Sequence, residues 1–104
     1  MKKELLHSLI LNASECSDFV TFCAECGGAL PEHYDDEKSM DALAKIWAYH
    51  DAQTFKTVRI LSGLSQKRYS DTYGIAVRTI EDWESGKRKP TEYLLELLLA
   101  DIVD

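Results

Sequence analysis

This sequence of 104 residues predicts an all-α fold, and three observations support the prediction. Apolar residues recur at three- and four-residue steps along most of the chain, as they do on one face of a helix. No segment alternates β-branched and polar residues over the length of a strand. Residues that favour helix starts precede several of the apolar stripes, and glycines follow some of them. We therefore expect short helices joined by short connections.

The first 53 residues are expected to form three of these helices. The first runs from about residue 3 to residue 12, where leucine and isoleucine recur at helical spacing. Ser14 is placed to cap a second helix, which ends at Gly27-Gly28. After a loop, Ser39 is placed to cap a third helix. The apolar face of this third helix is expected to contain Met40, Leu43, Ile46 and Trp47.

The helices of the C-terminal half are expected to be shorter. A helix that begins at Phe55 is stopped by Gly63. Ser65 is placed to cap the next helix, which runs to about Thr72. Gly74 then permits the left-handed backbone of a tight turn.

Two further helices follow the Gly74 turn. One runs from about Val77 to Glu84 and ends at Ser85-Gly86, and Thr91 is placed to cap a last, leucine-rich helix. Two short helices joined by a tight turn that contains glycine form a helix-turn-helix pattern. The predicted fold is therefore a compact helical domain containing a helix-turn-helix over residues 54–104, preceded by the N-terminal helices of residues 1–53.

The charge is distributed unevenly along the chain, although its net value is -6. Residues 1–53 contain four Lys or Arg and ten Asp or Glu. Residues 54–91 contain eight basic and four acidic residues, an excess of +4. Residues 92–104 contain four acids and no base. The basic segment indicates contact with nucleic acid, whereas the acidic N-terminal region is expected to dimerise or to contact another protein.

Composition also argues against several other classes of protein. No apolar run approaches the roughly 20 residues that cross a bilayer, and Glu4 and His7 interrupt the N-terminal stretch. We therefore expect an amphipathic helix in a cytoplasmic protein rather than a signal peptide. No Gly-rich phosphate loop and no paired metal carboxylates appear, so we expect neither catalysis nor a cofactor.

The three cysteines invite a zinc interpretation, because Cys23 and Cys26 form one close pair. A structural zinc site needs four ligands, and Cys16, His7 and His33 do not form a standard second pair. On the second helix the three cysteines are expected to follow one apolar stripe as buried, reduced thiols. No metal site is therefore expected, and an odd number of cysteines argues against a secreted disulfide framework.

Residues 63–90 closely resemble the helix-turn-helix family of the Cro and phage-repressor (XRE-like) type, and the resemblance extends from residue 54 onward. The matching residues are Leu64-Ser65-Gln66, the Tyr73-Gly74-Ile75 turn, Arg78-Thr79-Ile80 and Trp83-Glu84-Ser85-Gly86. Several matches at fixed spacing are far more specific than a lone glycine turn. The resemblance implies a domain that binds double-stranded DNA and places its recognition helix at about residues 77–84. Where the family often has an N-cap serine, this chain has Ala76, which forgoes a cap of about 1 kcal/mol.

Ala76, Ile80 and Trp83 are expected on the buried face of the recognition helix. The base-reading residues are expected to be Val77, Arg78, Glu81 and Asp82. Among them, an arginine can donate to guanine, a glutamate can accept from cytosine and a valine can contact a thymine methyl. In an alternative interpretation, Arg78 is a surface residue paired with one of the two acids.

The resemblance also implies phosphate contacts from the start of the preceding helix and from the recognition helix with its following loop. The matching residues are Gln66, Lys67, Arg68, Thr79, Lys87, Arg88 and Lys89. Three consecutive cations suit a phosphate-binding loop, although an ordinary solvated loop can have the same composition.

A transcriptional repressor that acts as a dimer on a short palindromic DNA site fits these features best, because one such motif reads only a few base pairs. The leucine-rich last helix carries more apolar residues than one packing face needs, so it could supply the dimer interface, as could the N-terminal helices. Two alternatives stay open. One is the antitoxin of a toxin–antitoxin pair that represses its own operon. The other is an acidic protein-interaction module, for example a phage-type inhibitor that uses the motif as a scaffold.

Overall fold

The computed structural model describes residues 1–103, and over them the chain consists of helices joined by turns and loops, without a strand. The N-terminal half contains α1 (Lys3–Glu15), α2 (Phe19–Cys26), the 3-10 turn η1 (Gly27–Ala29) and α3 (Asp36–Ala52). The C-terminal half contains α4 (Phe55–Ser62), α5 (Gln66–Tyr73), α6 (Val77–Ser85) and α7 (Glu92–Ile102). The all-α prediction is confirmed, and no helix over residues 1–103 is long and apolar enough to cross a membrane.

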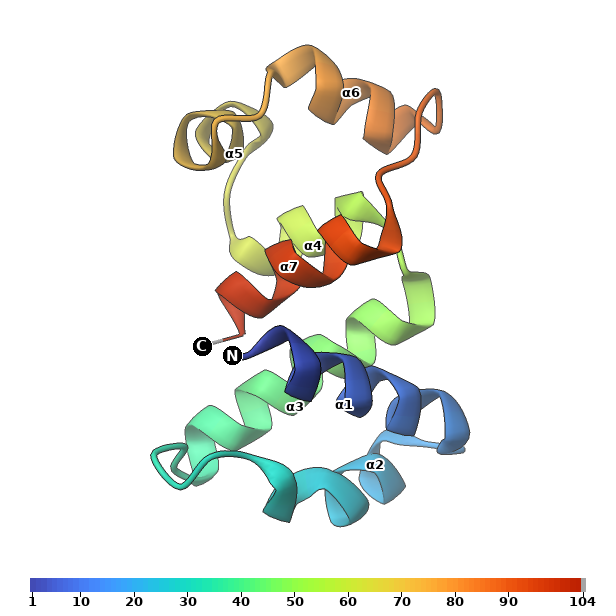
Figure 1. Ribbon diagram of the computed structural model, residues 1–104, viewed down its shortest axis with the longest axis vertical. Coiled ribbons are helices and arrows are strands. Elements are labelled where there is room, and N and C mark those ends of the chain that lie inside the picture. Colours follow the sequence, from blue (N-terminus) through green and yellow to red (C-terminus); the bar gives the residue numbers. More distant parts are fainter. Residues whose placement is uncertain (104) are drawn as a thin grey trace.

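The helices are arranged in three levels along the longest axis of the molecule (Figure 1). Helices α5 and α6 lie at one end, α4 and α7 in the middle, and α1, α2 and α3 at the other end. Helix α7 packs against both α4 and α1, so one cluster of buried side chains joins the two halves of the chain. Residues 1–53 and residues 54–103 are therefore packed around a common core.

The two caps predicted for the C-terminal half, Ser65 and Thr91, are confirmed, because their hydroxyl groups accept hydrogen bonds from backbone amides in the first turns of α5 and α7. Thr54 caps α4 in the same way, although no cap was predicted there. Gly63 and Gly74 end α4 and α5 in the left-handed conformation. At each predicted boundary the expected residue type is present.

The Ser14 cap of the second helix was predicted wrongly. Helix α1 continues through residue 15, and the Ser14 hydroxyl donates to the backbone oxygen of Leu11 at 2.7 Å. Asp18 caps α2 instead, and its carboxylate accepts from the amide of Thr21 at 2.8 Å. The carboxylate also places a negative charge at the positive end of the helix dipole.

The Ser39 cap of the third helix was also wrong, because α3 begins three residues earlier than Ser39. Asp35 is its cap and accepts from the amide of Lys38 at 2.7 Å. This start places Asp36 and Glu37 in the first turn, where the helix dipole stabilises negative charge. These acids therefore start the longest helix of the N-terminal half.

The expected stripe of three buried cysteines does not form. Cys16 lies between α1 and α2, and only Cys26 is buried. The Cys16 thiol lies 3.3 Å from a carboxylate oxygen of Glu25 and donates to it. Desolvation and this hydrogen bond raise the pKa of Cys16 to about 11, and desolvation raises the pKa of Cys23 as well. Among residues 1–103, no three His, Cys, Asp or Glu side chains come together as a metal-binding group.

Helix α7 uses most of its apolar surface inside the molecule, because it lies between α1 and α4. Of the large apolar side chains on α7, Tyr93 and Leu97 stay exposed, at 62% and 40%. The one acid buried on this helix, Glu96, accepts from His7 Nδ1 at 2.8 Å and lies 3.6 Å from Lys3 Nζ. The N-terminal helices therefore cover α7, and the apolar remainder expected for a partner is small.

The N-terminal half also supplies hydrogen-bond donors to the end of α7. The Tyr34 hydroxyl donates to the backbone oxygen of Val103 at 3.0 Å. Lys45 Nζ lies 3.4 Å from the backbone oxygen of Ile102. The last carbonyl groups of a helix have no partner within the helix, and a positive charge beside them is favourable.

Candidate nucleic-acid interface

Aromatic side chains hold α4, α5 and α6 together beneath the surface that would face DNA. The ring of Phe55 on α4 lies 5.3 Å from Tyr69 on α5 and 5.0 Å from Trp83 on α6, both edge-on. Tyr69 stacks on Tyr73 at 4.4 Å. Ile80 of α6 is fully buried in the same core. Such aromatic contacts add to the energy of burial, so α6 has a fixed position on α4 and α5.

The connection between α5 and α6 is as short as a helix-turn-helix requires. Gly74 adopts a φ of +69°, where a side chain would be strained, and α6 begins three residues later. Ala76 gives α6 no side-chain cap, as its sequence predicts. Ala76 is exposed, however, so its expected place on the buried face was wrong, because it precedes the first helical turn. Ile80 and the half-buried Trp83 do lie on the inner face.

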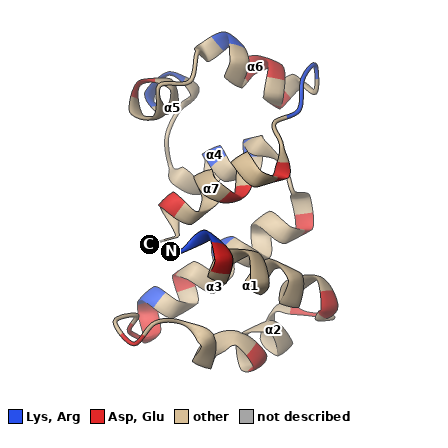
Figure 2. Cartoon of the chain, in the orientation of Figure 1, with Lys and Arg blue, Asp and Glu red and all other residues tan. Residues whose placement is uncertain are grey.

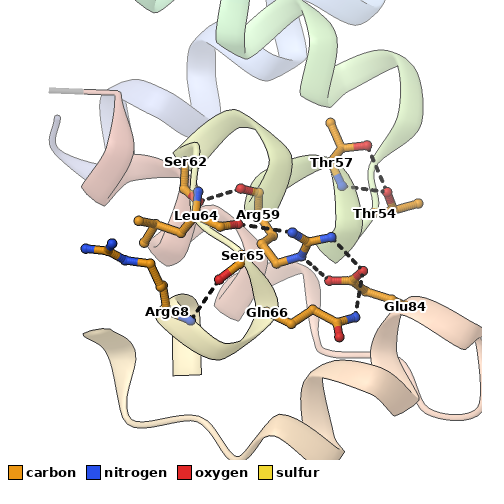
Figure 3. A network of polar contacts seen from close by, with 9 residues as sticks. All are labelled: Thr54, Thr57, Arg59, Ser62, Leu64, Ser65, Gln66, Arg68 and Glu84. Atoms are coloured by element: carbon orange, nitrogen blue, oxygen red, sulfur yellow. Dashed lines mark hydrogen bonds and ion pairs between the residues drawn. The ribbon is translucent and has the colours of Figure 1, made fainter. Parts of the chain in front are cut away.

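A polar network fixes the start of α5 against the end of α6 (Figure 3). Arg59 of α4 donates through Nε and Nη2 to the two carboxylate oxygens of Glu84, at 2.5 and 3.0 Å. Its Nη1 donates to the backbone oxygen of Leu64 at 3.0 Å, and Gln66 Nε2 donates to Glu84 at 3.3 Å. Both charged side chains are mostly covered. Burial raises the pKa of Glu84, but the hydrogen bonds from Arg59 and Gln66 outweigh it, so this pKa lies below its ordinary value.

Three of the four residues expected to read bases are exposed on α6. The Arg78 side chain is 75% exposed, and Val77 and Glu81 are also exposed. Asp82 differs, because only 14% of its side chain is exposed. Its carboxylate lies 3.5 Å from Arg78 Nε, so the alternative pairing of Arg78 with Asp82 is formed without covering the arginine.

The loop after α6 is attached to the helix through Arg88. Its Nε lies 3.2 Å from the second carboxylate oxygen of Asp82, and its Nη2 donates to Thr79 Oγ1 at 3.3 Å. The Arg88 amide also donates to the backbone oxygen of Asp82 at 3.2 Å. Lys87 and Lys89 are exposed on either side of it. Arg88, Thr79 and Asp82 therefore form one connected group.

The remaining phosphate candidates lie at the start of α5. Lys67 is 84% exposed and lies 3.7 Å from Asp71 one turn later, and Arg68 is exposed. Gln66 is half-buried, with its amide group at Glu84. Figure 2 shows Lys and Arg on α5, at the start of α6 and in the loop after α6, all at one end of the molecule. Helices α5 and α6 carry acidic residues at this end as well, whereas most of the acidic residues lie on the other helices, away from it.

Sequence reasoning missed two features of this site, namely the Arg59–Glu84 pair and the contact of Arg88 with Asp82 and Thr79. The members of the first pair are 25 residues apart, and the second depends on the path of the loop. No periodicity or local spacing indicates either contact.

Comparison with known protein families gives a match in the C-terminal half of the chain. Residues 55–100 match the family model described as Helix-turn-helix. No curated protein and no solved structure matches the chain significantly. The matched range starts at the first residue of α4 and ends within α7, and it includes the Gly74 turn, α6 and the basic loop. Residues 55–100 therefore belong to the helix-turn-helix family of the Cro and phage-repressor (XRE-like) type, which is a family of DNA-binding regulatory domains.

Proposed function

We propose that this protein is a transcriptional repressor that binds a specific sequence of double-stranded DNA as a dimer. The observation that carries the proposal is the exposed Arg78 on α6, with a basic cluster on each side of it along the chain. In this arrangement α6 enters the major groove, and the flanking cations contact the two phosphate strands. A protein with this function has no catalytic step, and occupation of the DNA site is its whole activity.

In this proposal the base contacts come from the exposed face of α6. Arg78 donates two hydrogen bonds to guanine, Glu81 accepts from cytosine N4, and Val77 contacts a thymine methyl group. Asp82 lies on the same face at the i+4 position from Arg78. Each bidentate contact supplies roughly 1–3 kcal/mol of discrimination against the wrong base.

Phosphate contacts are assigned to seven residues around α6. They are Gln66, Lys67, Arg68, Thr79, Lys87, Arg88 and Lys89. Every phosphate that a cation neutralises releases counterions, so binding should weaken as salt is added. The acids of residues 1–53 lie mainly at the far end of the molecule and do not oppose this contact.

A dimer is proposed because one recognition helix reads only a few base pairs, and two copies across a palindrome double the contact. The surface of α7 offered to a second copy is the exposed pair Tyr93 and Leu97, which are one helical turn apart. Light scattering of the purified protein with and without DNA measures the stoichiometry. A Leu97→Lys variant that binds DNA as a monomer would support α7 as the interface.

The deciding experiment is a selection of duplexes from a random library by the full-length protein, followed by fluorescence anisotropy at several salt concentrations. The proposal expects an enriched palindromic sequence that is bound at least about 1,000-fold more tightly than a scrambled duplex. Salt-sensitive binding without a sequence preference would show that the protein binds DNA non-specifically, which would overturn the proposed specific recognition. Failure to bind any duplex at low salt would overturn the proposal and favour the protein-interaction module, in which the acidic residues 1–53 would contact the partner.

A further inference from the structure

We infer that Asp82 is a positioning residue, which orients Arg78 for base recognition and Arg88 for phosphate contact rather than touching a base itself. This inference rests on the proposed function, because it concerns how the same surface reads DNA. It changes the role expected of Asp82 from the sequence alone and leaves Val77, Arg78 and Glu81 at the base edges.

The geometry separates Asp82 from its neighbours on α6. Each oxygen of its carboxylate faces a different arginine, with Arg78 Nε at 3.5 Å and Arg88 Nε at 3.2 Å. The side chain of Asp82 is 14% exposed, whereas those of Arg78 and Arg88 are 75% and 57% exposed. Asp82 is therefore mostly covered, whereas the two arginine side chains that contact it are open to the solvent from which DNA would approach.

Because Asp82 contacts each arginine through Nε, terminal nitrogens of both guanidinium groups are available for DNA. Arg78 keeps its two terminal nitrogens, which are the donors that a bidentate contact with guanine can use. Arg88 uses one terminal nitrogen for Thr79 and keeps the other. A long arginine side chain loses rotamer freedom when it binds a base, and a carboxylate that already restricts it reduces that cost.

The same arrangement explains how an acid is tolerated on a surface that approaches phosphates. An unpaired carboxylate there would repel DNA of every sequence, but this one is neutralised by two cations at short range. Arg88 also anchors the loop after α6, since its backbone amide donates to the Asp82 carbonyl. Asp82 therefore links the base-reading part of the surface to the phosphate-binding part.

Three possible roles of Asp82 predict different behaviour of Asp82→Asn. A positioning role predicts a loss of discrimination at the base pair read by Arg78. A direct base contact predicts a changed preference at a different base pair. Simple repulsion of phosphates predicts tighter binding to all duplexes by the same factor, with the preference unchanged.

The test uses the full-length protein and the duplex selected with it. Binding is measured for that duplex and for derivatives in which one base pair at a time is replaced, using wild type, Arg78→Ala, Asp82→Asn and the double variant. The base pair read by Arg78 is the one at which Arg78→Ala loses discrimination. We expect Asp82→Asn to lose about tenfold of the discrimination at that base pair and to have no further effect on this discrimination in the Arg78→Ala background.

Asp71→Asn is the matched control for charge. Asp71 is an exposed acid on α5 that lies near Lys67 and has no contact with Arg78 or Arg88. It removes the same charge from the same basic segment, so we expect it to alter the salt dependence while keeping the preference at the Arg78 base pair. A loss of discrimination equal to that of Asp82→Asn would overturn the positioning role.

A second readout does not depend on DNA. Nitrogen-15 spectra of the arginine Nε–H groups in the free protein should show Arg78 and Arg88 shifted by Asp82→Asn, with Arg68 unchanged. Unshifted Arg78 and Arg88 signals would overturn the inference. If the wild-type protein binds the selected DNA and Asp82→Asn keeps full discrimination at the Arg78 base pair, the inference about Asp82 is overturned and the proposed function stands. Wild type that binds no duplex would overturn the proposed function, and the inference with it.

Discussion

Arg59 and Glu84 form a two-pronged ion pair that joins α4 to α6, with Arg59 Nε and Nη2 at 2.5 and 3.0 Å from the Glu84 carboxylate. The pair lies at the end of α6 opposite Arg78, and Gln66 from the start of α5 donates to the same carboxylate. The aromatic core and this pair together connect α6 to α4 and α5. Both side chains of the pair are mostly covered, so removal of one partner would leave the other charge without its counter-charge.

Glu84→Gln should lower the free energy of unfolding by about 2–4 kcal/mol at neutral pH, because it leaves the mostly covered Arg59 without its counter-charge. Urea denaturation of the full-length protein measures the change. Glu32→Gln, which removes an exposed acid in the loop before α3, is the control and should change stability by less than about 0.5 kcal/mol. Equal stability of Glu84→Gln and wild type would contradict a structural role for the pair.

The contribution of Glu84 should also depend on pH in a definite direction. Its pKa is lowered in the folded protein, so the stabilisation is fully present above the ordinary glutamate pKa of roughly 4.3. It is lost as the pH falls through the lower pKa of the folded state. The stability difference between wild type and Glu84→Gln should therefore be constant near neutrality and should shrink in acid. If the stability difference between wild type and Glu84→Gln grew as the pH fell, the pKa of Glu84 would not be lowered in the folded protein.

The two halves of the chain should unfold together, because α7 packs on both α1 and α4. Each half has one tryptophan, Trp47 on α3 and Trp83 on α6. In Trp47→Phe and Trp83→Phe variants, fluorescence reports on one half while circular dichroism reports on all helices. The two signals should give the same transition in each variant. Separate transitions would mean that residues 1–53 and 54–104 fold independently.

A substitution in α1 should weaken the helix-turn-helix for the same reason. Leu6 is fully buried in the common core, so Leu6→Ala should lower the free energy of unfolding by about 2–5 kcal/mol. The unfolding transition reported by Trp83 fluorescence should show the same loss of stability as the transition reported by circular dichroism. Leu11→Ala, at a position 54% exposed on the same helix, is the control and should have little effect. If Leu6→Ala left the Trp83 transition unchanged, the coupling of the two halves would be refuted.

Local signals in the sequence predicted most of the helices, because their causes are local. The Ser65 and Thr91 caps and the Gly74 turn each need only the residue type and the following few residues. The failures came where several candidate caps stood close together. Ser14 was predicted as the cap of the second helix, but Asp18 caps α2 with a carboxylate, which interacts favourably with the positive end of the helix.

Features that depend on contact between distant segments could not be predicted. Glu96 interrupts an apolar helix and would be expected at the surface, but α1 brings His7 and Lys3 against it. The surplus of leucines on α7 indicated a partner, and the partner of most of them is the same chain. The candidate site residues follow from the resemblance and stay a prediction, whereas the link between Asp82 and Arg88 depends on the path of the loop.

The cysteines should react slowly in the folded protein. Desolvation and the hydrogen bond to Glu25 raise the pKa of Cys16 to about 11, which lowers the fraction of reactive thiolate at neutral pH. Alkylation by iodoacetamide at pH 7.5, followed by mass spectrometry, should be at least about tenfold slower for Cys16 in native protein than in urea. Its rate should increase as the pH approaches 11. Equal rates in native and unfolded protein would refute the raised pKa.

Lys87→Ala should weaken binding to every duplex by a similar factor, because a phosphate contact carries no sequence information. It should also reduce the slope of log affinity against log salt by about 0.9, the value for one phosphate. Lys38→Ala removes the same charge from α3, in the acidic half, and should leave both affinity and slope unchanged. An effect of Lys87→Ala confined to the selected sequence would contradict its assignment to a phosphate.

Arg78 should determine which base pair the protein prefers, because its side chain is 75% exposed on the outer face of α6. Arg78→Lys keeps the positive charge but loses the fork that makes two parallel hydrogen bonds to guanine. We expect it to bind a scrambled duplex about as well as wild type does and to lose about 5- to 100-fold of its preference at one base pair. Anisotropy titrations of single-base-pair derivatives at constant salt measure this preference. If Arg78→Lys and Arg78→Ala lowered the affinity for every duplex equally, Arg78 would be a phosphate contact, and another residue of α6 would have to supply the sequence preference.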